Sequence, residues 1–447
     1  MAKAKVRYEC SSCGAFYAQW TGKCSNCGEW NTVEQQADIS SIDIKKSGKQ
    51  LKITTVDEVN TYNREKNRIT TADKQLDVVL GGGLVHGSVV LLAGQPGIGK
   101  STLLMQVAHA LAKENSVLYV SGEESSHQVA SRAKRLKLSS KKLQLTSTTS
   151  ADDVAHTMVS NNLDIIVVDS IQTMTTENVT SAAGSVSQIT NSSQLLTKAA
   201  KETDTVLIIV GHVTKDGSIA GPKVLEHSVD VVLQFEGDRY GGFKVLRSVK
   251  NRYGSTNEAA IYEMENEGLI PVTNPSAALL AERQVVDGSV VLATMEGSRP
   301  VLVEVQALVN TTAYGYPKRA ASGFDLNRLN LLIAMLERRT KLNLADKDVY
   351  INIVGGIGVK DPAADLAVAM AIGSAQKGLK LTKNAVVFGE VGLSGEVRHV
   401  TGVDKRVAEA KKLGFEAAIG PNMRSGKKPA LLTSVSSVRD AMNLFLK

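Results

Sequence analysis

The sequence is poor in cysteine and in aromatic residues, and it has no long apolar run. Cysteine occurs four times in 447 residues and not at all after Cys27, so disulfide bonds cannot stabilise the larger part of the chain. The longest apolar stretches, such as residues 165–168 and 206–210, are far shorter than the roughly 18 residues typical of a membrane-spanning helix. These absences exclude a disulfide-rich scaffold and predict no membrane association.

The first residues also lack the pattern of a secretory signal. Residues 1–7 contain no apolar core and no small-residue cleavage site, and they lead directly into a cysteine motif. We therefore expect the protein to stay in the cytoplasm, where thiols remain reduced.

The four cysteines form two Cys-x2-Cys pairs, Cys10 with Cys13 and Cys24 with Cys27. This spacing lets four thiolates reach one tetrahedral ion, and the glycines that follow the pairs permit tight turns. The pattern predicts a structural Zn²⁺ site. Four protein ligands leave no open coordination position, so the zinc is expected to fold the segment and not to catalyse a reaction.

The length predicts several domains, because 447 residues at about 150 per domain correspond to roughly three. We expect a zinc ribbon over residues 1–31, a polar linker over 32–60, an α/β domain over 61–275 and an α+β domain over 276–447. In the 61–275 segment, short β-rich runs alternate with stretches of helical period. This alternation predicts a mostly parallel sheet covered by helices.

Basic residues outnumber acidic ones by 52 to 45, and the net charge of +7 is spread unevenly. Residues 125–150 contain basic side chains and no acidic one, and a second basic run lies between residues 239 and 252. Two interpretations stay open: these runs are solvated helix and strand faces, or they form a surface that binds a polyanion.

A phosphate-binding loop follows the first apolar strand of the 61–275 segment. It reads Gly94-Gln95-Pro96-Gly97-Ile98-Gly99-Lys100-Ser101, with Thr102 opening the next helical stretch. Its glycines and the helix N-terminus suit ATP phosphates, Lys100 suits the β and γ oxygens, and Ser101 suits Mg²⁺. A second apolar strand ends in Asp169, which we expect to help hold the Mg²⁺.

Hydrolysis also needs a carboxylate that orients water. Glu123 and Glu124 follow a strand between these two motifs, and we choose Glu123; the alternative is that both carboxylates only cap the next helix. His212 ends another strand, where it is a candidate neighbour of the γ-phosphate.

Several separate segments resemble the bacterial RadA (Sms) DNA-repair protein family. They are Trp20 to Cys24, Cys27 to Trp30, Gly81 to Leu84, Val168 to Thr173, and Lys250-Asn251-Arg252-Tyr253-Gly254. The last is similar to the family signature Lys-Asn-Arg-Phe-Gly, with Tyr253 in place of the usual Phe. The resemblance implies a RecA-like P-loop ATPase core between an N-terminal zinc ribbon and a C-terminal Lon-protease-like domain.

The resemblance also implies what the protein acts on. It implies a ring, expected to be a homohexamer, that moves on single-stranded DNA, extends branched recombination intermediates and works with a recombinase. Loops facing the DNA would include Lys215 and Lys223. Lys250 and Arg252 would act on the nucleotide of the neighbouring subunit.

The C-terminal segment resembles the proteolytic domain of Lon proteases but departs from its catalytic pattern. Ala364 stands in the position of the nucleophilic serine, and Asp404 stands where the dyad lysine belongs. A Ser-Lys hydrolase needs a hydroxyl and a neutral amine. We therefore predict that this domain is not a protease.

Three functions remain to be compared. The leading hypothesis is a DNA-dependent ATPase and helicase-like motor of DNA recombination and repair. The alternative is an ATP-gated DNA-binding scaffold without motor activity. An ATP-dependent protease is disfavoured by the missing Ser-Lys pair.

Overall fold

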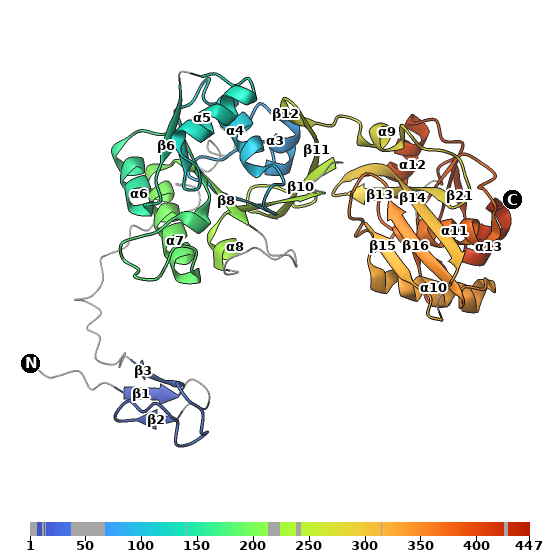
Figure 1. Cartoon of the computed structure of the whole chain (residues 1–447), viewed down its shortest axis with the longest axis horizontal. Helices are drawn as coiled ribbons and strands as arrows, with labels where there is room; N and C mark the ends of the chain where they lie inside the picture. Colours follow the sequence, from blue (N-terminus) through green and yellow to red (C-terminus); the bar gives the residue numbers. More distant parts are fainter. Residues whose placement is uncertain are drawn as a thin grey trace, which may run out of the picture. The chain divides into compact units, whose positions relative to one another are not determined.

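The structure is a computed structural model, and it describes residues 7–10, 13, 15–36, 68–140, 142–212, 224–237, 243–313, 315–423 and 428–447. The chain divides into two compact units, Met1–Thr61 and Tyr62–Lys447. Figure 1 shows their elements in sequence colours. Within the described residues, no helix has both the length and the apolar character needed to cross a bilayer.

The first unit is a three-stranded antiparallel sheet with the strand order β2-β1-β3. Its strands are β1 (Arg7–Cys10), β2 (Phe16–Tyr17) and β3 (Val33–Gln36). Val33 is buried with Cys10 and Cys24 in a small core, and it pairs with Cys10 across the sheet. Because this core needs Val33, the ribbon extends to Gln36, past the boundary expected at residue 31. Residues 37–60 of the expected linker lie outside the described residues.

The second unit begins with a nine-stranded sheet of order β12-β11-β10-β9-β4-β8-β7-β5-β6. Six strands pair in parallel: β4 (Val89–Gly94), β5 (Val117–Ser121), β6 (Leu143–Ser147), β7 (Ile165–Asp169), β8 (Val206–His212) and β9 (Val231–Gly237). Three antiparallel strands extend one edge: β10 (Phe243–Asn251), β11 (Ala259–Glu265) and β12 (Gly268–Pro271). The expected parallel α/β core is confirmed.

Helices cover both faces of the parallel strands. One face packs against α3 (Lys74–Leu80), α4 (Lys100–Leu111) and α5 (Ser126–Arg135), and the other against α6 (Ala151–Ser160), α7 (Val186–Thr203) and the short α8 (Val224–Ser228). Within β4, Val90 and Leu92 join the first core while Val89 and Leu91 join the second. Burial on both faces explains why these strands are continuous apolar runs.

The C-terminal part contains a seven-stranded sheet of order β15-β16-β14-β13-β17-β20-β21 and a small hairpin, β18-β19. The strands are β13 (Ser289–Glu296), β14 (Arg299–Thr311), β15 (Arg319–Ser322), β16 (Lys347–Ile353), β17 (Ala385–Val387), β18 (Glu390–Val391), β19 (Val397–Arg398), β20 (Ala417–Gly420) and β21 (Leu432–Ser434). The helices are α9 (Pro275–Leu280), α10 (Leu326–Thr340), α11 (Ala364–Lys377), α12 (Val403–Lys412) and α13 (Val438–Phe445). Alanine-rich α11 is buried from Ala364 to Ser374, because small side chains let neighbouring elements approach closely.

The two parts of the second unit share a hydrophobic core. Phe243 and Val245 of β10 and Ile261 of β11 are buried in the same apolar cluster as the C-terminal sheet. Arg247 adds ion pairs to Glu236 in β9 and to Glu296 in β13. The boundary expected near residue 275 therefore lies beside a continuous core, which explains why residues 62–447 form one unit.

Removing the C-terminal part should destabilise the nucleotide-binding part. A chain ending at Asn274 would expose Phe243, Val245 and Ile261, and each such apolar side chain gains about 1.5–3 kcal/mol from burial. We expect a clearly lower melting temperature and aggregation, measured by calorimetry against the full chain. A truncated chain that melts at the temperature of the full chain would contradict the shared core.

Candidate functional site

The phosphate-binding loop lies between β4 and α4, at the carboxyl edge of the parallel sheet. Gly97 and Gly99 have φ angles of 78° and 115°, in the region that favours glycine. A Cβ on Gly99 would lie 2.9 Å from Met264 Cε, so a side chain there would also be crowded. The backbone is thus shaped to direct N–H groups and the N-terminus of α4 at an anion.

Lys100 is buried and lies across this loop. Its Nζ donates to the carbonyl oxygens of Gly94 at 2.9 Å and Gln95 at 3.0 Å, and it lies 3.3 Å from His212 Nδ1. Burial lowers the pKa of Lys100 to about 8, although the nearby carboxylates of Asp169 and Glu123 act to raise it. The ammonium is therefore buried on neutral carbonyl oxygens, for which a charged phosphate would be a better partner.

Asp169 ends the buried strand β7, and its carboxylate accepts a 2.6 Å hydrogen bond from the Tyr119 hydroxyl of β5. Burial, reinforced by the charge of Asp169, raises the pKa of Tyr119 well above its usual range, so the phenol stays a neutral donor. Ser101 and Asp169 line the same cleft and supply the hard oxygen ligands that Mg²⁺ prefers. These residues fit the ion. Sequence reasoning missed Tyr119, although it is the one aromatic residue of the buried strand β5.

Glu123 faces this cleft from the end of β5. The Ser170 hydroxyl donates to Glu123 Oε1, and His212 Nε2 lies 3.3 Å from the same oxygen. Partial burial favours the neutral acid, but these two hydrogen bonds lower the pKa of Glu123 below its usual value. Gly122 is required just before it, since a Cβ there would lie 2.1 Å from Thr173 Oγ1. The result is an ionised carboxylate able to orient water.

Glu124 points elsewhere, because its carboxylate forms an ion pair with Arg132 of α5. The cleft itself has a volume of about 340 Å³, within the range of ligand sites. It is lined by Pro96, Gly97, Gly99, Lys100, Ser101, Thr102, Glu123, Arg132, Arg135, Asp169, His212 and Met264. The structure thus brings Glu123, and not the carboxylate of Glu124, together with the predicted phosphate and magnesium residues. Sequence reasoning had placed Arg132 and Arg135 only in a basic run.

Lys250 and Arg252 do not join this cleft within one chain. In β10, Lys250 pairs with Val232 and Asn251 pairs with Val231, and Val231 pairs with Val90 near the amino end of β4. The loop begins at Gly94, four residues further along β4, which corresponds to roughly 13 Å. The two cations therefore lie at the edge of the sheet opposite the loop of their own chain. Lys215 and Lys223, the predicted DNA contacts, lie outside the described residues.

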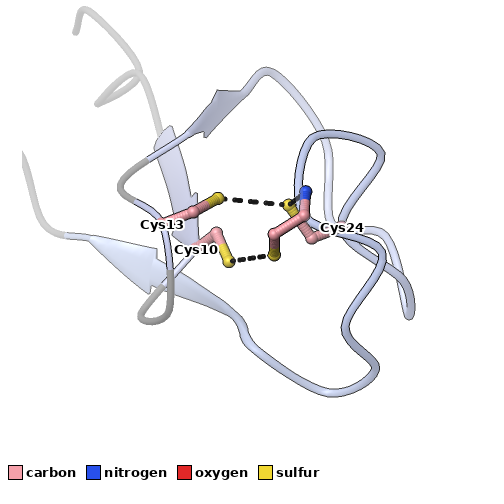
Figure 2. A group of neighbouring side chains, drawn as sticks. Cys10, Cys13 and Cys24 are labelled. Atoms are coloured by element: carbon pink, nitrogen blue, oxygen red, sulfur yellow. Dashed lines mark hydrogen bonds between the residues drawn. The ribbon is translucent and has the colours of Figure 1, made fainter.

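The four cysteine sulfur atoms converge in the ribbon, and all lie within 4.8 Å of one another. The Sγ atoms of Cys10 and Cys27 are 3.7 Å apart, and those of Cys13 and Cys24 are 3.5 Å apart; Figure 2 shows three of these side chains directed inward. Tetrahedral zinc with Zn–S bonds of about 2.3 Å places sulfur atoms roughly 3.8 Å apart, so the cluster fits a four-cysteine zinc site. The Tyr17 hydroxyl, 3.0 Å from Cys24 Sγ, lowers the pKa of that thiol to about 6 and favours the thiolate.

In the C-terminal part, Ala364 is buried in the first turn of α11 and Asp404 lies in the first turn of α12. The nearest lysine in sequence, Lys405, donates from Nζ to the Ser298 carbonyl oxygen at 3.1 Å. Arg328 of α10 pairs with the buried Asp365. These positions supply a packed scaffold without a serine–lysine pair.

Comparison with known proteins matches three separate segments of the chain to protein families. Residues 8–35 match the rubredoxin metal binding domain, residues 57–218 match the AAA domain family, and residues 318–424 match the family of subunit ChlI of Mg-chelatase. Proteins named DNA repair protein RadA are similar over nearly their whole length. The protein of Aquifex aeolicus is 47% identical, and the match covers 94% of both chains. That of Pseudomonas aeruginosa is 47% identical over 98% of both chains, and that of Bacillus subtilis is 44% identical over 100% of both chains.

Loss of one cysteine ligand should remove the metal from the zinc site. Cys24→Ser should release the zinc and unfold the ribbon, because so small a core depends on the metal. Both tryptophans of the chain, Trp20 and Trp30, lie in the ribbon, so their fluorescence reports on it alone. We expect metal analysis to find one zinc in the parent chain and none in the variant, with Gln19→Ala as an unaffected surface control. Full zinc content in the Cys24→Ser protein would contradict the assignment.

The environment of Lys100 predicts a pH dependence for nucleotide binding. Phosphates stabilise the ammonium form, so the pKa of about 8 in the free protein should rise when nucleotide binds. The affinity should then be constant below about pH 8 and fall at higher pH by at most tenfold per pH unit, with uptake of one proton.

Titration calorimetry with a non-hydrolysable ATP analogue, in buffers of different ionisation enthalpy, measures this proton directly. Lys100→Arg keeps its charge at all these pH values and should show no such uptake. An affinity of the parent chain that does not change between about pH 7.5 and 9.5 would contradict the prediction.

Proposed function

The chain belongs to the DNA repair protein RadA family, and we propose that it is a DNA-dependent ATPase of recombination and repair that works as a ring motor on single-stranded DNA. The observation that carries the proposal is the cleft in which Lys100, Asp169, Glu123 and His212 converge. A protein that only bound ATP as a switch would need the phosphate loop but no oriented carboxylate beside it.

Each side chain has a separate task in this proposal. Lys100 leaves the Gly94 and Gln95 carbonyls to hold the β- and γ-phosphates, and Ser101 with Asp169 holds Mg²⁺. The ion, when bound, neutralises phosphate charge. Glu123 orients the attacking water, while Ser170 and His212 keep the carboxylate ionised and correctly turned.

We further propose that Lys250 and Arg252 complete the site of a neighbouring subunit. Because they lie at the sheet edge opposite their own loop, they can approach a nucleotide only if another copy presents it. Such a head-to-tail contact repeats around a closed ring, and the family resemblance suggests a homohexamer. A cation placed on the γ-phosphate stabilises the charge of the transition state.

Single-stranded DNA and branched recombination intermediates are the proposed substrates, with a recombinase as partner. The family membership and the net charge of +7 support a polyanion as ligand. Lys215 and Lys223 remain proposed contacts to the phosphate backbone. The four thiolates of the zinc site suit the reducing cytoplasm. We also propose that residues 276–447 have no peptidase activity, because Ala364 has no hydroxyl and Asp404 has no amine.

Strand separation on forked DNA tests the motor, with Glu123→Gln and Glu124→Gln as matched variants. Glu123→Gln should bind ATP but hydrolyse it about 10²-fold or more slowly and lose strand separation. Glu124→Gln should keep most of both activities, because the carboxylate of Glu124 pairs with Arg132 and does not line the cleft.

Strand separation by the parent chain with a non-hydrolysable ATP analogue would favour the alternative, an ATP-gated scaffold without motor activity. A larger loss in Glu124→Gln than in Glu123→Gln would show that the wrong carboxylate has been chosen.

A further inference from the structure

The segment Lys250–Gly254 is held firmly within its own chain. Lys250 Nζ donates to three carbonyl oxygens at the end of α8, those of Glu226 at 2.7 Å, His227 at 3.2 Å and Val229 at 2.8 Å. The side chain of Arg252 is 58% exposed, and its Nη1 lies 3.3 Å from Asp230 Oδ1. Arg252 therefore presents its guanidinium to the surface while one end rests on a carboxylate.

Asp230 is a buried junction, and its side chain is only 3% exposed. Its Oδ2 accepts from the backbone N–H of Val89 at 3.0 Å and from Lys201 Nζ of α7. Its backbone N–H donates to the Val89 carbonyl, and its own carbonyl accepts from the N–H of Arg252 at 3.1 Å. A buried carboxylate keeps its charge only when fixed partners surround it. Through these partners, Asp230 connects Arg252 to Val89, the first residue of β4.

The main chain after Arg252 is fixed on its other side. Arg68 Nη2 donates to the Tyr253 carbonyl oxygen at 2.7 Å, and Asn251 Nδ2 donates to the Val79 carbonyl at 3.3 Å. Gly254 lies against Gly81, where a Cβ on Gly254 would be only 2.8 Å from the Gly81 Cα. With the backbone held in this way, the direction of Arg252 depends mainly on the group that its guanidinium contacts.

We propose that Asp230 is a positioning residue that aims Arg252 at the nucleotide bound by the neighbouring subunit. This role rests on the proposed function, since it requires that a second subunit present its nucleotide. A long arginine side chain loses much rotamer freedom when it is aimed, and a fixed carboxylate supplies that order before the nucleotide arrives. In this role Asp230 acts through Arg252 and not on the nucleotide itself.

Asp230→Asn tests the role with little change in shape. The amide oxygen can still accept from the Val89 N–H, but the side chain no longer offers a charge to Arg252. We expect kcat for DNA-stimulated ATP hydrolysis to fall about 10²-fold with little change in KM for ATP. Lys198→Met on α7 is the control, because the exposed Lys198 side chain pairs with Glu202 and not with Asp230. Its kcat should stay within about twofold of the parent value.

Mixed assemblies separate positioning from a general loss of structure. Asp230→Asn subunits keep an intact loop, and Lys100→Ala subunits keep an intact Arg252, so mixing them restores complete sites between unlike neighbours. At equal amounts and random assembly, about a quarter of the parent activity should return. Asp230→Asn mixed with Arg252→Ala should return none, because neither subunit supplies a correctly directed Arg252. Lys100→Ala mixed with Arg252→Ala serves as the reference for the cross-subunit site.

The outcomes distinguish the positioning role of Asp230 from the cross-subunit site on which it depends. If the reference pair regains activity and the Asp230→Asn with Lys100→Ala pair does not, Asp230 supports only its own subunit and the positioning role is wrong, while the proposed function stands. If the reference pair fails as well, the cross-subunit site is wrong and the role of Asp230 falls with it. An unchanged kcat in Asp230→Asn alone would also overturn the role.

Discussion

The buried parallel strand β4 is the element on which the nucleotide chemistry of this protein depends. At its carboxyl end, Gly94 pairs with both Phe235 and His212 and opens the phosphate loop. At its amino end, the Val89 carbonyl accepts a hydrogen bond from the Asp230 backbone N–H, and the Val89 N–H donates to the Asp230 carboxylate. Because parallel strands share one direction, the ends of β5, β7 and β8 bring Glu123, Asp169 and His212 to the same edge as the loop.

Charge within the cleft is balanced by short-range contacts before any nucleotide arrives. Lys100 rests on carbonyl oxygens, Asp169 is held by a neutral phenol, and Glu123 is held by a hydroxyl and an imidazole. Phosphate can replace the carbonyl oxygens at Lys100, a divalent cation can bind the carboxylate of Asp169, and water can bind the carboxylate of Glu123. Preorganisation of this kind lowers the cost of reorganising the site when the nucleotide binds. The zinc ribbon, by contrast, has only a minimal core, and we expect its order to depend on the metal.

The sequence was sufficient to predict the features that depend on local pattern. Apolar strands buried on both faces, the glycines of the phosphate loop and the Cys-x2-Cys spacing all have signatures within a few residues, and the parallel sheet and the zinc cluster agree with them. Contacts between distant segments left no such signature. Tyr119 and Asp169 are 50 residues apart, and the pairing of Arg132 with Glu124 depends on how α5 turns back over the cleft. The shared core of β10 and the C-terminal sheet likewise depends on tertiary packing, which a composition change near Pro275 could not reveal.

We propose that one catalytic site is built from two copies of the chain, with Arg252 brought from the opposite edge of a neighbour's sheet. The most direct measurement is an experimental structure of the assembled protein with single-stranded DNA and a non-hydrolysable ATP analogue. We expect the Arg252 guanidinium of one subunit to lie within hydrogen-bond distance of the γ-phosphate held by Lys100 of the next. A γ-phosphate contacted only by residues of the subunit that binds it would contradict a site shared between subunits.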